Sequence, residues 1–229
     1  MFLEVERKFS PSAVALIARN AGCPPFKNFT TLPTTAFRDT YFDLETTLRD
    51  QGMWLRRRGN DWELKVKTGG DFINSSFQEI SGTEEIEQTL TKHFPRASLS
   101  TPKTPCSSND GRNTLGTLSL APFAEITTTR QAWIAQTPSK DILQIVVDTT
   151  DFGHRVGEVE LAWDGVDTAA QDSSRLKMDQ IVSEFMNHHK WAFPDGKCKG
   201  KLSAYFEWRE TLAMDGAPLK TTEQQRGQE

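Results

Sequence analysis

A chain of 229 residues with 36% hydrophobic and 25% charged side chains suits one large domain or two small ones, and leaves many charges to place around an apolar core. Its formal net charge of −4 argues against nucleic acid as a partner. The three cysteines are far apart and form no CxxC pair, which argues against a zinc site or a disulfide framework and favours a reducing compartment.

The N-terminus has acidic residues at positions 4 and 6 and no apolar run, so we expect no secretory signal. No apolar stretch of the sequence is long enough to span a membrane. These features predict a cytoplasmic protein with neither a membrane nor a nucleic acid as its partner, and we expect it to be a monomer.

Residues 3–9 (LEVERKF) predict a strand whose two faces differ. Because alternation by two is the period of a β-strand, Glu4, Glu6 and Lys8 share one face. Two carboxylates about 7 Å apart on one face repel each other unless a positive group lies between them. A divalent cation is one such group, because hard cations take oxygen ligands. An ordinary solvated strand face is the alternative for this stretch alone.

A short helix and a long strand follow. The helix is predicted from the apolar spacing after residue 13, and Gly22 ends it. Residues from Thr30 to Asp43 are rich in Thr, Phe and Tyr and predict a long strand, with Pro33 as a break near its start. Asp39, Tyr41 and Asp43 share one face of that strand.

A β-hairpin is predicted next, with strands from Leu48 to Arg58 and from Asp61 to Lys67 around the tight turn Gly59-Asn60. One face of the hairpin is apolar. The other face carries Trp54 and four bases, namely Arg56, Arg58, Lys65 and Lys67. If the apolar face packs against helices, the basic face lines a groove or the interior of a barrel.

The remaining strands are predicted in the second half of the chain and repeat this two-faced pattern. They cover residues 72–81 with Glu79, residues 118–136 with Arg130, residues 142–148 ending in Asp148, and residues 156–163 with Glu158 and Glu160. The segment from Leu118 to Gln136 can form either a hairpin that turns near Arg130 or one bent strand.

Three further helices are predicted, from Thr83 to about Phe94, over residues 175–190 and over about residues 203–213. Residues 96–116 are rich in Ser, Thr, Pro, Asn and Gly and predict an exposed loop insertion. Residues 215–229 predict a polar C-terminal tail. Residues 1–214 are expected to form one domain.

Strands with one charged and one apolar face close naturally into an antiparallel barrel with a polar lumen and an apolar exterior covered by helices. An interior with this many acids and bases is too costly to be plain packing. Bases bind phosphate oxygens, acids bind Mg²⁺, and Mg²⁺ bridges to the phosphates. The charged faces therefore predict a site for a polyanion and a metal.

Several motifs together resemble the CYTH family of triphosphate tunnel enzymes. Glu4-x-Glu6-x-Lys8 is similar to the ExExK signature of that family. The runs FRDTY, WLRRR and WELK, together with DFG followed by VGEVE, are similar in order and spacing to its thiamine triphosphatase branch; they cover residues 37–41, 54–58, 62–65 and 151–160. The resemblance extends over about residues 1–165 and is thinner in the C-terminal helices, where Lys201 and Tyr205 still match.

The resemblance implies an α+β fold in which an eight-stranded antiparallel β-barrel, the triphosphate tunnel, carries flanking helices. It also implies an Mg²⁺-dependent hydrolase acting on a small-molecule triphosphate. Thiamine triphosphate is the favoured substrate, giving thiamine diphosphate and phosphate. The alternatives are an inorganic triphosphatase, an adenylate cyclase, or a triphosphate-binding module without catalysis. The sequence shows no base-recognition site for a cyclase, and a pure binder would need neither Tyr41 nor Lys65.

Carried over position by position, the resemblance assigns three sets of residues. The triphosphate would be bound by Lys8, Arg56, Arg58, Arg130 and Lys201. One or two Mg²⁺ ions would be held, directly or through water, by Glu4, Glu6, Glu79, Asp148, Glu158 and Glu160. Tyr41 and Lys65 would form a catalytic dyad that positions or activates the attacking water. Neighbouring cations depress the pKa of a lysine, although the acids oppose that effect here.

Trp54 bears on the choice of substrate, because its strand parity places it in the lumen beside Arg56 and Arg58. An indole suits stacking on a flat, cationic organic ring such as that of thiamine. The alternative is a structural role for Trp54 at the tunnel mouth.

Other notable residues are interpreted as structural. Lys67, Asp39 and Asp43 are expected to be solvated, and His188-His189 to be a surface pair at a helix end. The tryptophans at positions 62, 133 and 163 are expected in the core, and the Cys198 thiol is taken as incidental.

Overall fold

The computed structural model describes residues 2–71, 73–94, 115, 120–164, 170–194, 196 and 198–214. In that part of the chain, nine strands belong to one sheet, together with five α-helices and one 3₁₀ helix. The strands are β1 (Phe2–Phe9), β2 (Lys27–Thr31), β3 (Thr35–Asp43), β4 (Met53–Arg58), β5 (Asp61–Gly70), β6 (Asn74–Ser81), β7 (Ala121–Gln136), β8 (Ile142–Thr150) and β9 (Arg155–Asp164). The helices are η1 (Pro11–Ala13), α1 (Val14–Arg19), α2 (Thr47–Asp50), α3 (Thr83–His93), α4 (Gln171–His188) and α5 (Lys201–Met214).

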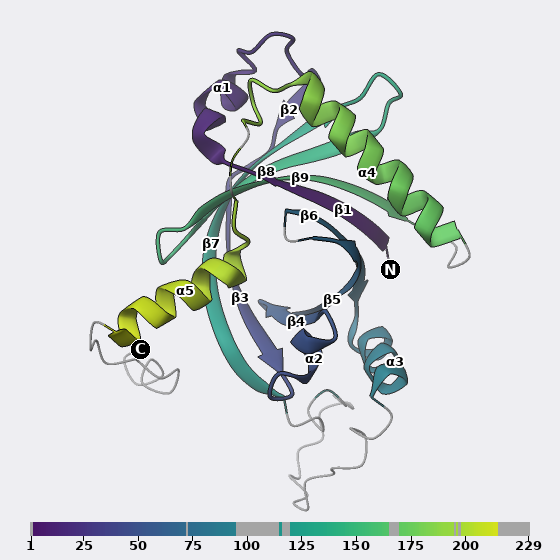
Figure 1. The fold of residues 1–229 in the computed structure, drawn as a ribbon, viewed down its shortest axis with the longest axis vertical. Helices are drawn as coiled ribbons and strands as arrows, with labels where there is room; N and C mark the ends of the chain where they lie inside the picture. The colour runs from purple at the N-terminus through teal and green to yellow at the C-terminus, as the bar shows by residue number, and fades with distance from the viewer. Residues whose placement is uncertain are drawn as a thin grey trace, which may run out of the picture.

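Eight of the strands form a closed antiparallel barrel (Figure 1). They follow the order β7-β3-β4-β5-β6-β1-β9-β8, and β8 pairs back onto β7, while β2 is an extra strand beside β7. This closure confirms the predicted eight-stranded antiparallel barrel with flanking helices. The segment left open in the sequence is the single strand β7, whose first part pairs with β3 and whose last part pairs with β8.

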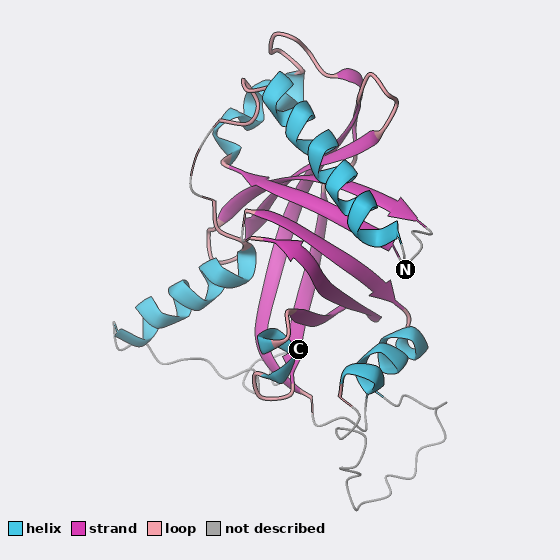
Figure 2. Cartoon of the chain, turned by 45° about the vertical axis from the view of Figure 1, so that its right-hand side comes forward, coloured by secondary structure: helices cyan, strands magenta, loops and turns pink. Residues whose placement is uncertain are grey.

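Helices cover the outward, apolar faces of the barrel strands. Helix α4 crosses β1 and β9 (Figure 2), where Met178 and Val182 pack in one core cluster with Val5 and Leu161. Helices α2 and α3 cover the hairpin strands through a second cluster built on residues such as Leu48, Leu55, Leu64 and Ile86. The apolar side of the predicted hairpin is therefore buried by helices, and its charged side turns inward.

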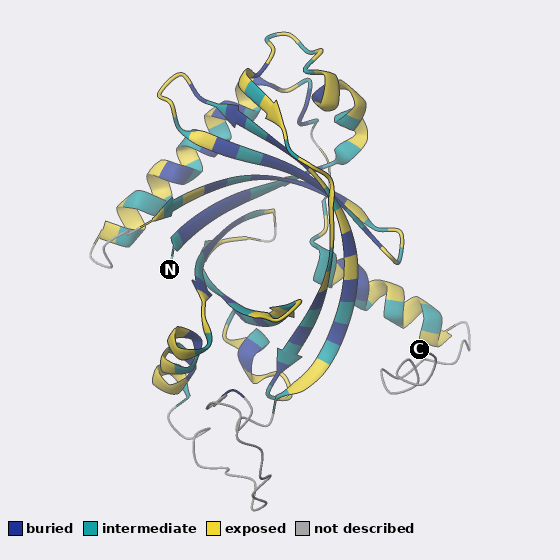
Figure 3. Cartoon of the chain, turned by 180° about the vertical axis from the view of Figure 1, so that it is seen from behind, coloured by how far each residue is buried: buried dark blue, intermediate teal, exposed yellow. Residues whose placement is uncertain are grey.

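Helix α5 closes part of the lumen instead of covering the outside. Its first residue, Lys201, lines the interior cavity, and Tyr205 packs in a small buried cluster with Tyr41 and Ile126. The C-terminal part of α5 extends away from the barrel and is largely exposed (Figure 3). None of the helices among the described residues is long and apolar enough to cross a membrane.

The predicted strand from Leu48 to Arg58 is wrong in its first part, which forms helix α2. The cause is Asp43, which was expected to be solvated but is only 1% exposed. Its carboxylate accepts the backbone N–H groups of Leu44 and Leu48 at 2.7 and 2.8 Å and the Nε–H of Arg49 at 2.8 Å. These bonds hold the short helix, and Gly52, at φ +68°, returns the chain to β4.

The prediction that His188 and His189 form a surface pair at the end of α4 is correct for His188 and wrong for His189. His188 is exposed, but His189 is buried against the rings of Phe26 and Phe185, and its Nδ1 lies 2.9 Å from the Phe185 carbonyl oxygen. The three tryptophans expected in the core behave as predicted: Trp133 is fully buried, and positions 62 and 163 pack against the two clusters. The predicted loop at 96–116, apart from Leu115, and the predicted tail at 215–229 lie outside the described residues.

Replacing Asp43 by Ala should lower the free energy of unfolding by about 2–3 kcal/mol, because buried N–H donors and Arg49 lose a charged acceptor. Urea denaturation measures the change. Asp50→Ala is the control, since Asp50 lies in the same helix with an exposed carboxylate that bonds only the Thr46 hydroxyl among the interactions described, and it should change stability by less than about 0.5 kcal/mol. Equal losses in both variants would contradict the role given to Asp43.

Candidate active site

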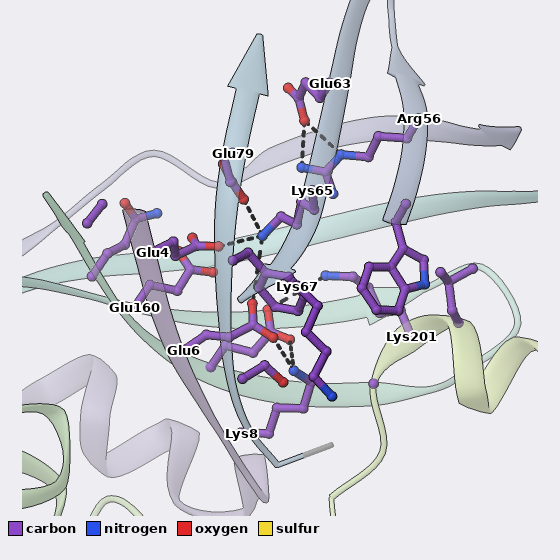
Figure 4. Close-up of a pocket in the computed structure, with 18 of the residues that line it drawn as sticks. Glu4, Glu6, Lys8, Arg56, Glu63, Lys65, Lys67, Glu79, Glu160 and Lys201 are labelled. Atoms are coloured by element: carbon purple, nitrogen blue, oxygen red, sulfur yellow. Dashed lines mark hydrogen bonds and ion pairs between the residues drawn. The ribbon is translucent and has the colours of Figure 1, made fainter. Parts of the chain in front are cut away.

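The barrel encloses a cavity of about 610 Å³ that reaches from β1 across to β5 and to the start of α5. Among the described residues, seven acidic and seven basic side chains line it. The acids are Glu4, Glu6, Glu63, Asp71, Glu79, Glu158 and Glu160, and the bases are Lys8, Arg56, Arg58, Lys65, Lys67, Arg130 and Lys201. Figure 4 shows the charged groups that it labels, among them Glu4, Lys65 and Glu79, pointing toward one another from strands that are far apart in the sequence.

The strand period accounts for this convergence. Antiparallel pairing sets Glu6 opposite Glu160 and Lys8 opposite Glu158, while Lys65 lies between Trp54 and Glu79 on its two neighbouring strands. Directly opposed residues point to the same face of a sheet, so one inward residue fixes the orientation of its partners. All the predicted site residues except Asp148 line the cavity.

Lys65 stands at the centre of the acidic part of the cavity. Its Nζ lies 2.5 Å from Glu4 Oε2 and 3.7 Å from Glu6 Oε2, and it forms a third ion pair with Glu79 (Figure 4). Burial lowers the pKa of Lys65, but the carboxylates of Glu4, Glu79 and Glu6 outweigh it and hold the pKa well above its ordinary value. In this arrangement Lys65 is an ammonium, which differs from the depressed pKa considered for a catalytic dyad.

The pKa values of the cavity acids shift in different directions. Burial raises the pKa of Glu160 to about 8, and the nearby Glu4 and Glu158 add to this effect against the attraction of Arg130. Burial also raises the pKa of Glu4 and of Glu6. In contrast, Lys201 and Lys8 overcome the effect of burial and hold the pKa of Glu158 well below its ordinary value. Within a lining that is balanced in charge, burial therefore outweighs the nearby bases for Glu160, Glu4 and Glu6 but not for Glu158.

Two buried aspartates that do not line the cavity each bond an arginine that does. Arg130 donates from Nε and Nη2 to the two oxygens of Asp148, at 2.7 and 2.8 Å, and Lys201 also bonds this carboxylate. Asp148 was predicted to bind metal, but it is fully buried and does not line the cavity. Arg58 donates in the same way to Asp39, at 2.7 and 2.8 Å.

Asp39 corrects a sequence interpretation, because it was expected to be solvated and is only 1% exposed. Its parity with Tyr41, which was placed in the site, is the signal that could have located it. Glu63 was also missed as a functional residue: it lines the cavity and accepts hydrogen bonds from Arg56, with an Nη2–Oε2 distance of 2.6 Å. Lys67 likewise lines the cavity instead of a solvated face.

One end of the cavity is aromatic. The rings of Trp54 and Phe77 meet edge to face, with centroids 5.6 Å apart and an interplanar angle of 88°. Both residues line the cavity, as does Tyr41, which is buried beside Tyr205. The cavity therefore combines aromatic rings with charged groups, an arrangement that suits a ligand with a ring and an anionic chain.

The lumen glutamates have the oxygen donors that a hard cation requires. In the part of the chain that the structure describes, no three His, Cys, Asp or Glu side chains are grouped closely enough to hold a metal ion as they stand. Lys65 lies among Glu4, Glu6 and Glu79. A metal at these carboxylates would therefore require Lys65 to move.

Comparisons with known proteins place this architecture in a family. The model of the CYTH domain matches residues 3–186. Thiamine-triphosphatase from Homo sapiens is 30% identical over 168 residues, which cover 69% of this chain and 67% of that protein, and the same values hold for thiamine-triphosphatase from Macaca fascicularis.

Solved structures with a related shape are more distant. A putative adenylyl cyclase from Hippeastrum with a dominant triphosphatase activity is 18% identical, with a TM-score of 0.47 and coverage of 90% of this chain and 96% of that one. The Mimivirus capping enzyme triphosphatase is 11% identical, with a TM-score of 0.33 and coverage of 79% and 90%. The family model spans β1 to β9 and most of α4, so the chain belongs to the CYTH domain family.

Proposed function

We propose that this chain is a triphosphate hydrolase that cleaves the terminal phosphate of thiamine triphosphate, giving thiamine diphosphate and phosphate, with Mg²⁺ as cofactor. The observation that carries the proposal is the cavity itself, in which bases, glutamates and an aromatic end face one another. Membership of the CYTH domain family and the similarity to human thiamine-triphosphatase support the reaction class.

The bases would bind the triphosphate through its oxygens. They are Lys8, Arg56, Arg58, Arg130 and Lys201, and all five line the cavity. Arg58 and Arg130 each use Nε and Nη2 for a buried aspartate. Nη1 of Arg130 lies 3.8 Å from Glu160 Oε1, a distance at which a phosphate oxygen could replace or join that carboxylate. A guanidinium held in this way can approach phosphate oxygens with a fixed orientation.

Charge balance supports a cation as the companion of the substrate. The cavity lining is formally neutral among the described residues, and a triphosphate would add several negative charges to it. We assign Mg²⁺ to Glu4, Glu6, Glu79, Glu158 and Glu160. Asp148 would instead support Arg130 and Lys201, which take both of its oxygens in the structure. When bound, Mg²⁺ would neutralise charge on the phosphate oxygens and on the leaving diphosphate.

Lys65 and Tyr41 would position the attacking water in the dyad that we propose. Lys65 is an ammonium while it faces Glu4, Glu6 and Glu79, so it first acts as a hydrogen-bond donor. It would release its proton more readily once these carboxylates are engaged by another cation, because their charges are what raise its pKa. Tyr41 lines the same cavity, and its hydroxyl would orient the water.

Trp54 gives the reason for choosing an organic triphosphate over inorganic triphosphate. The basic residues alone would bind either compound. The indole lines the cavity at its aromatic end, where a cationic ring can stack on it.

Phosphate release from thiamine triphosphate, inorganic triphosphate and ATP, measured side by side with Mg²⁺ and with a chelator, tests the proposal. We expect a strong preference for the thiamine compound and loss of activity in chelator. A preference for inorganic triphosphate would still support a metal-dependent triphosphatase, but it would contradict the proposed binding of a thiamine ring. Binding without release from any of the three would indicate a binding module.

Trp54→Ala should raise the KM for thiamine triphosphate about 10-fold and change that for inorganic triphosphate less than about twofold, since only the first has a ring to stack. Trp62→Ala is the matched control: Trp62 lies on the neighbouring strand and packs outward against Phe42, so it should reduce stability without changing the ratio of the two KM values. Equal increases in both KM values for Trp54→Ala would remove the ring-stacking role.

Glu160→Gln should flatten the dependence of stability on pH in the absence of metal. Between the ordinary Glu pKa of 4.5 and the raised value of about 8, folded Glu160 keeps a proton that the unfolded chain has released. The unfolded state then binds fewer protons, so this group makes the free energy of unfolding fall as pH rises through that window.

Denaturation midpoints from pH 5 to pH 9 in chelator measure this difference. Glu84→Gln, an exposed position in α3, should give a curve parallel to that of the wild type. If Glu160→Gln also gave a curve parallel to that of the wild type, Glu160 could not have the raised pKa that keeps its carboxyl protonated in the folded state.

A further inference from the structure

Asp39 is buried behind the basic wall of the cavity. It is 1% exposed and does not itself line the cavity. Its Oδ1 accepts the Nε–H of Arg58 at 2.7 Å and its Oδ2 accepts an Nη2–H of the same guanidinium at 2.8 Å. A side-on pair of this kind fixes the plane of a guanidinium as well as its position.

Arg58 is held on a second side by an aromatic ring. Its Cζ lies 3.9 Å from the centroid of the Phe37 ring, and Phe37 shares strand β3 with Asp39. One edge of the guanidinium is thus bonded and one face is covered, while the side chain keeps 26% of its surface exposed. The group reaches the cavity with few orientations available to it.

Arg56 is linked to the same carboxylate. Its Nη1 lies 3.7 Å from Asp39 Oδ2, and its Nη2 lies 2.6 Å from Glu63 on the other side. Arg56 and Arg58 point to the same face of β4, about 7 Å apart along the strand, where two like charges repel. The Asp39 carboxylate lies between them in the ion-pair network and reduces that repulsion.

A second account of Asp39 makes the opposite prediction. If its charge only offset the arginines, then removing that charge would leave the cavity more positive and would tighten the binding of a polyanion. If it orders Arg58, then removing it frees a long side chain whose ordering must be repeated at each binding event, and binding weakens. The bidentate geometry and the Phe37 contact favour ordering, because a distant counter-charge would need neither.

We propose that Asp39 is a positioning residue that holds Arg58 in the orientation that binds the triphosphate and offsets the repulsion between Arg58 and Arg56. The inference rests on the proposed function, because it concerns how the same cavity binds its substrate. Asp39 touches the arginines and not the substrate, so its effect must pass through them.

The test measures the Kd of inorganic triphosphate by calorimetry in chelator, which prevents turnover, for the full chain. Asp39→Asn should raise the Kd about 10-fold. Asp43→Asn is the matched control: Asp43 is equally buried four residues further along the same strand, but its carboxylate holds α2 and Arg49 and not the cavity arginines. That variant should lose stability and keep the Kd within about twofold of the wild type.

A double-mutant cycle shows whether the effect passes through Arg58. Asp39→Asn introduced into an Arg58→Gln background should change the Kd by less than about threefold, because the group that it positions is already gone. Tighter binding by Asp39→Asn, or full additivity of the two substitutions, would overturn the inference.

Arg58→Lys covers the case in which Asp39→Asn does not fold. It keeps the charge but cannot form the side-on pair with Asp39, so it should also raise the Kd about 10-fold. Binding equal to that of the wild type would show that orientation is not required and would overturn the inference. If the wild type itself did not bind inorganic triphosphate while it folded normally, the inference would be overturned, and phosphate release from thiamine triphosphate with Mg²⁺ would still decide the proposed function separately.

Discussion

An antiparallel strand turns alternate side chains to opposite faces, and closing such strands into a barrel encloses one of those faces completely. In this protein the closure is made where β8 pairs back onto β7. The enclosed face carries the charged members of β1, β4, β5 and β9, and the outward face carries the apolar residues that α2, α3 and α4 cover. Core and cavity are thus two sides of the same strands, so the geometry of one cannot change without the other.

Enclosing so many charges is costly unless each has a partner, and the lumen meets this requirement with a network of ion pairs. The network is uneven. Asp39 and Asp148 each accept hydrogen bonds from an arginine that lines the cavity. For Glu160 and Glu4, in contrast, burial raises the pKa and so disfavours the ionised form. In the proposed function, the polyanion and the cation would together complete this charge arrangement, because the cation would pair with the glutamates and the anion with the arginines.

The sequence was sufficient for features that depend on local period. The inward faces of β1 and of the hairpin strands follow from alternation alone. The order of the motifs along the chain was enough to predict that these strands close into a barrel.

Features that depend on a residue distant in the sequence could not be predicted from local period. Asp39 and Asp43 have the same parity and look alike in the sequence. One binds Arg58 and the other holds a helix that starts four residues later. The protonation of Lys65 is a further case, since it is set by Glu79 on the neighbouring strand β6 and by Glu4 on β1, one strand further around the barrel. Likewise, residues 121–136 could form either a hairpin or one bent strand, and their pairing with β3 and β8 on either side decides for one strand.

The pairing of β1 has a consequence for how the chain can be made. During synthesis β1 leaves the ribosome before the other eight strands of the sheet, yet it pairs with β6 and, through Glu6 opposite Glu160, with β9 near the end of the barrel. Contacts so distant in sequence form late, since a large loop must be closed before they contribute. The strand that carries the signature motif therefore waits, unpaired on one edge, until translation has passed β9. The emerging chain is most exposed to misassociation in that interval, and its folding rate should depend more on this last closure than on any helix.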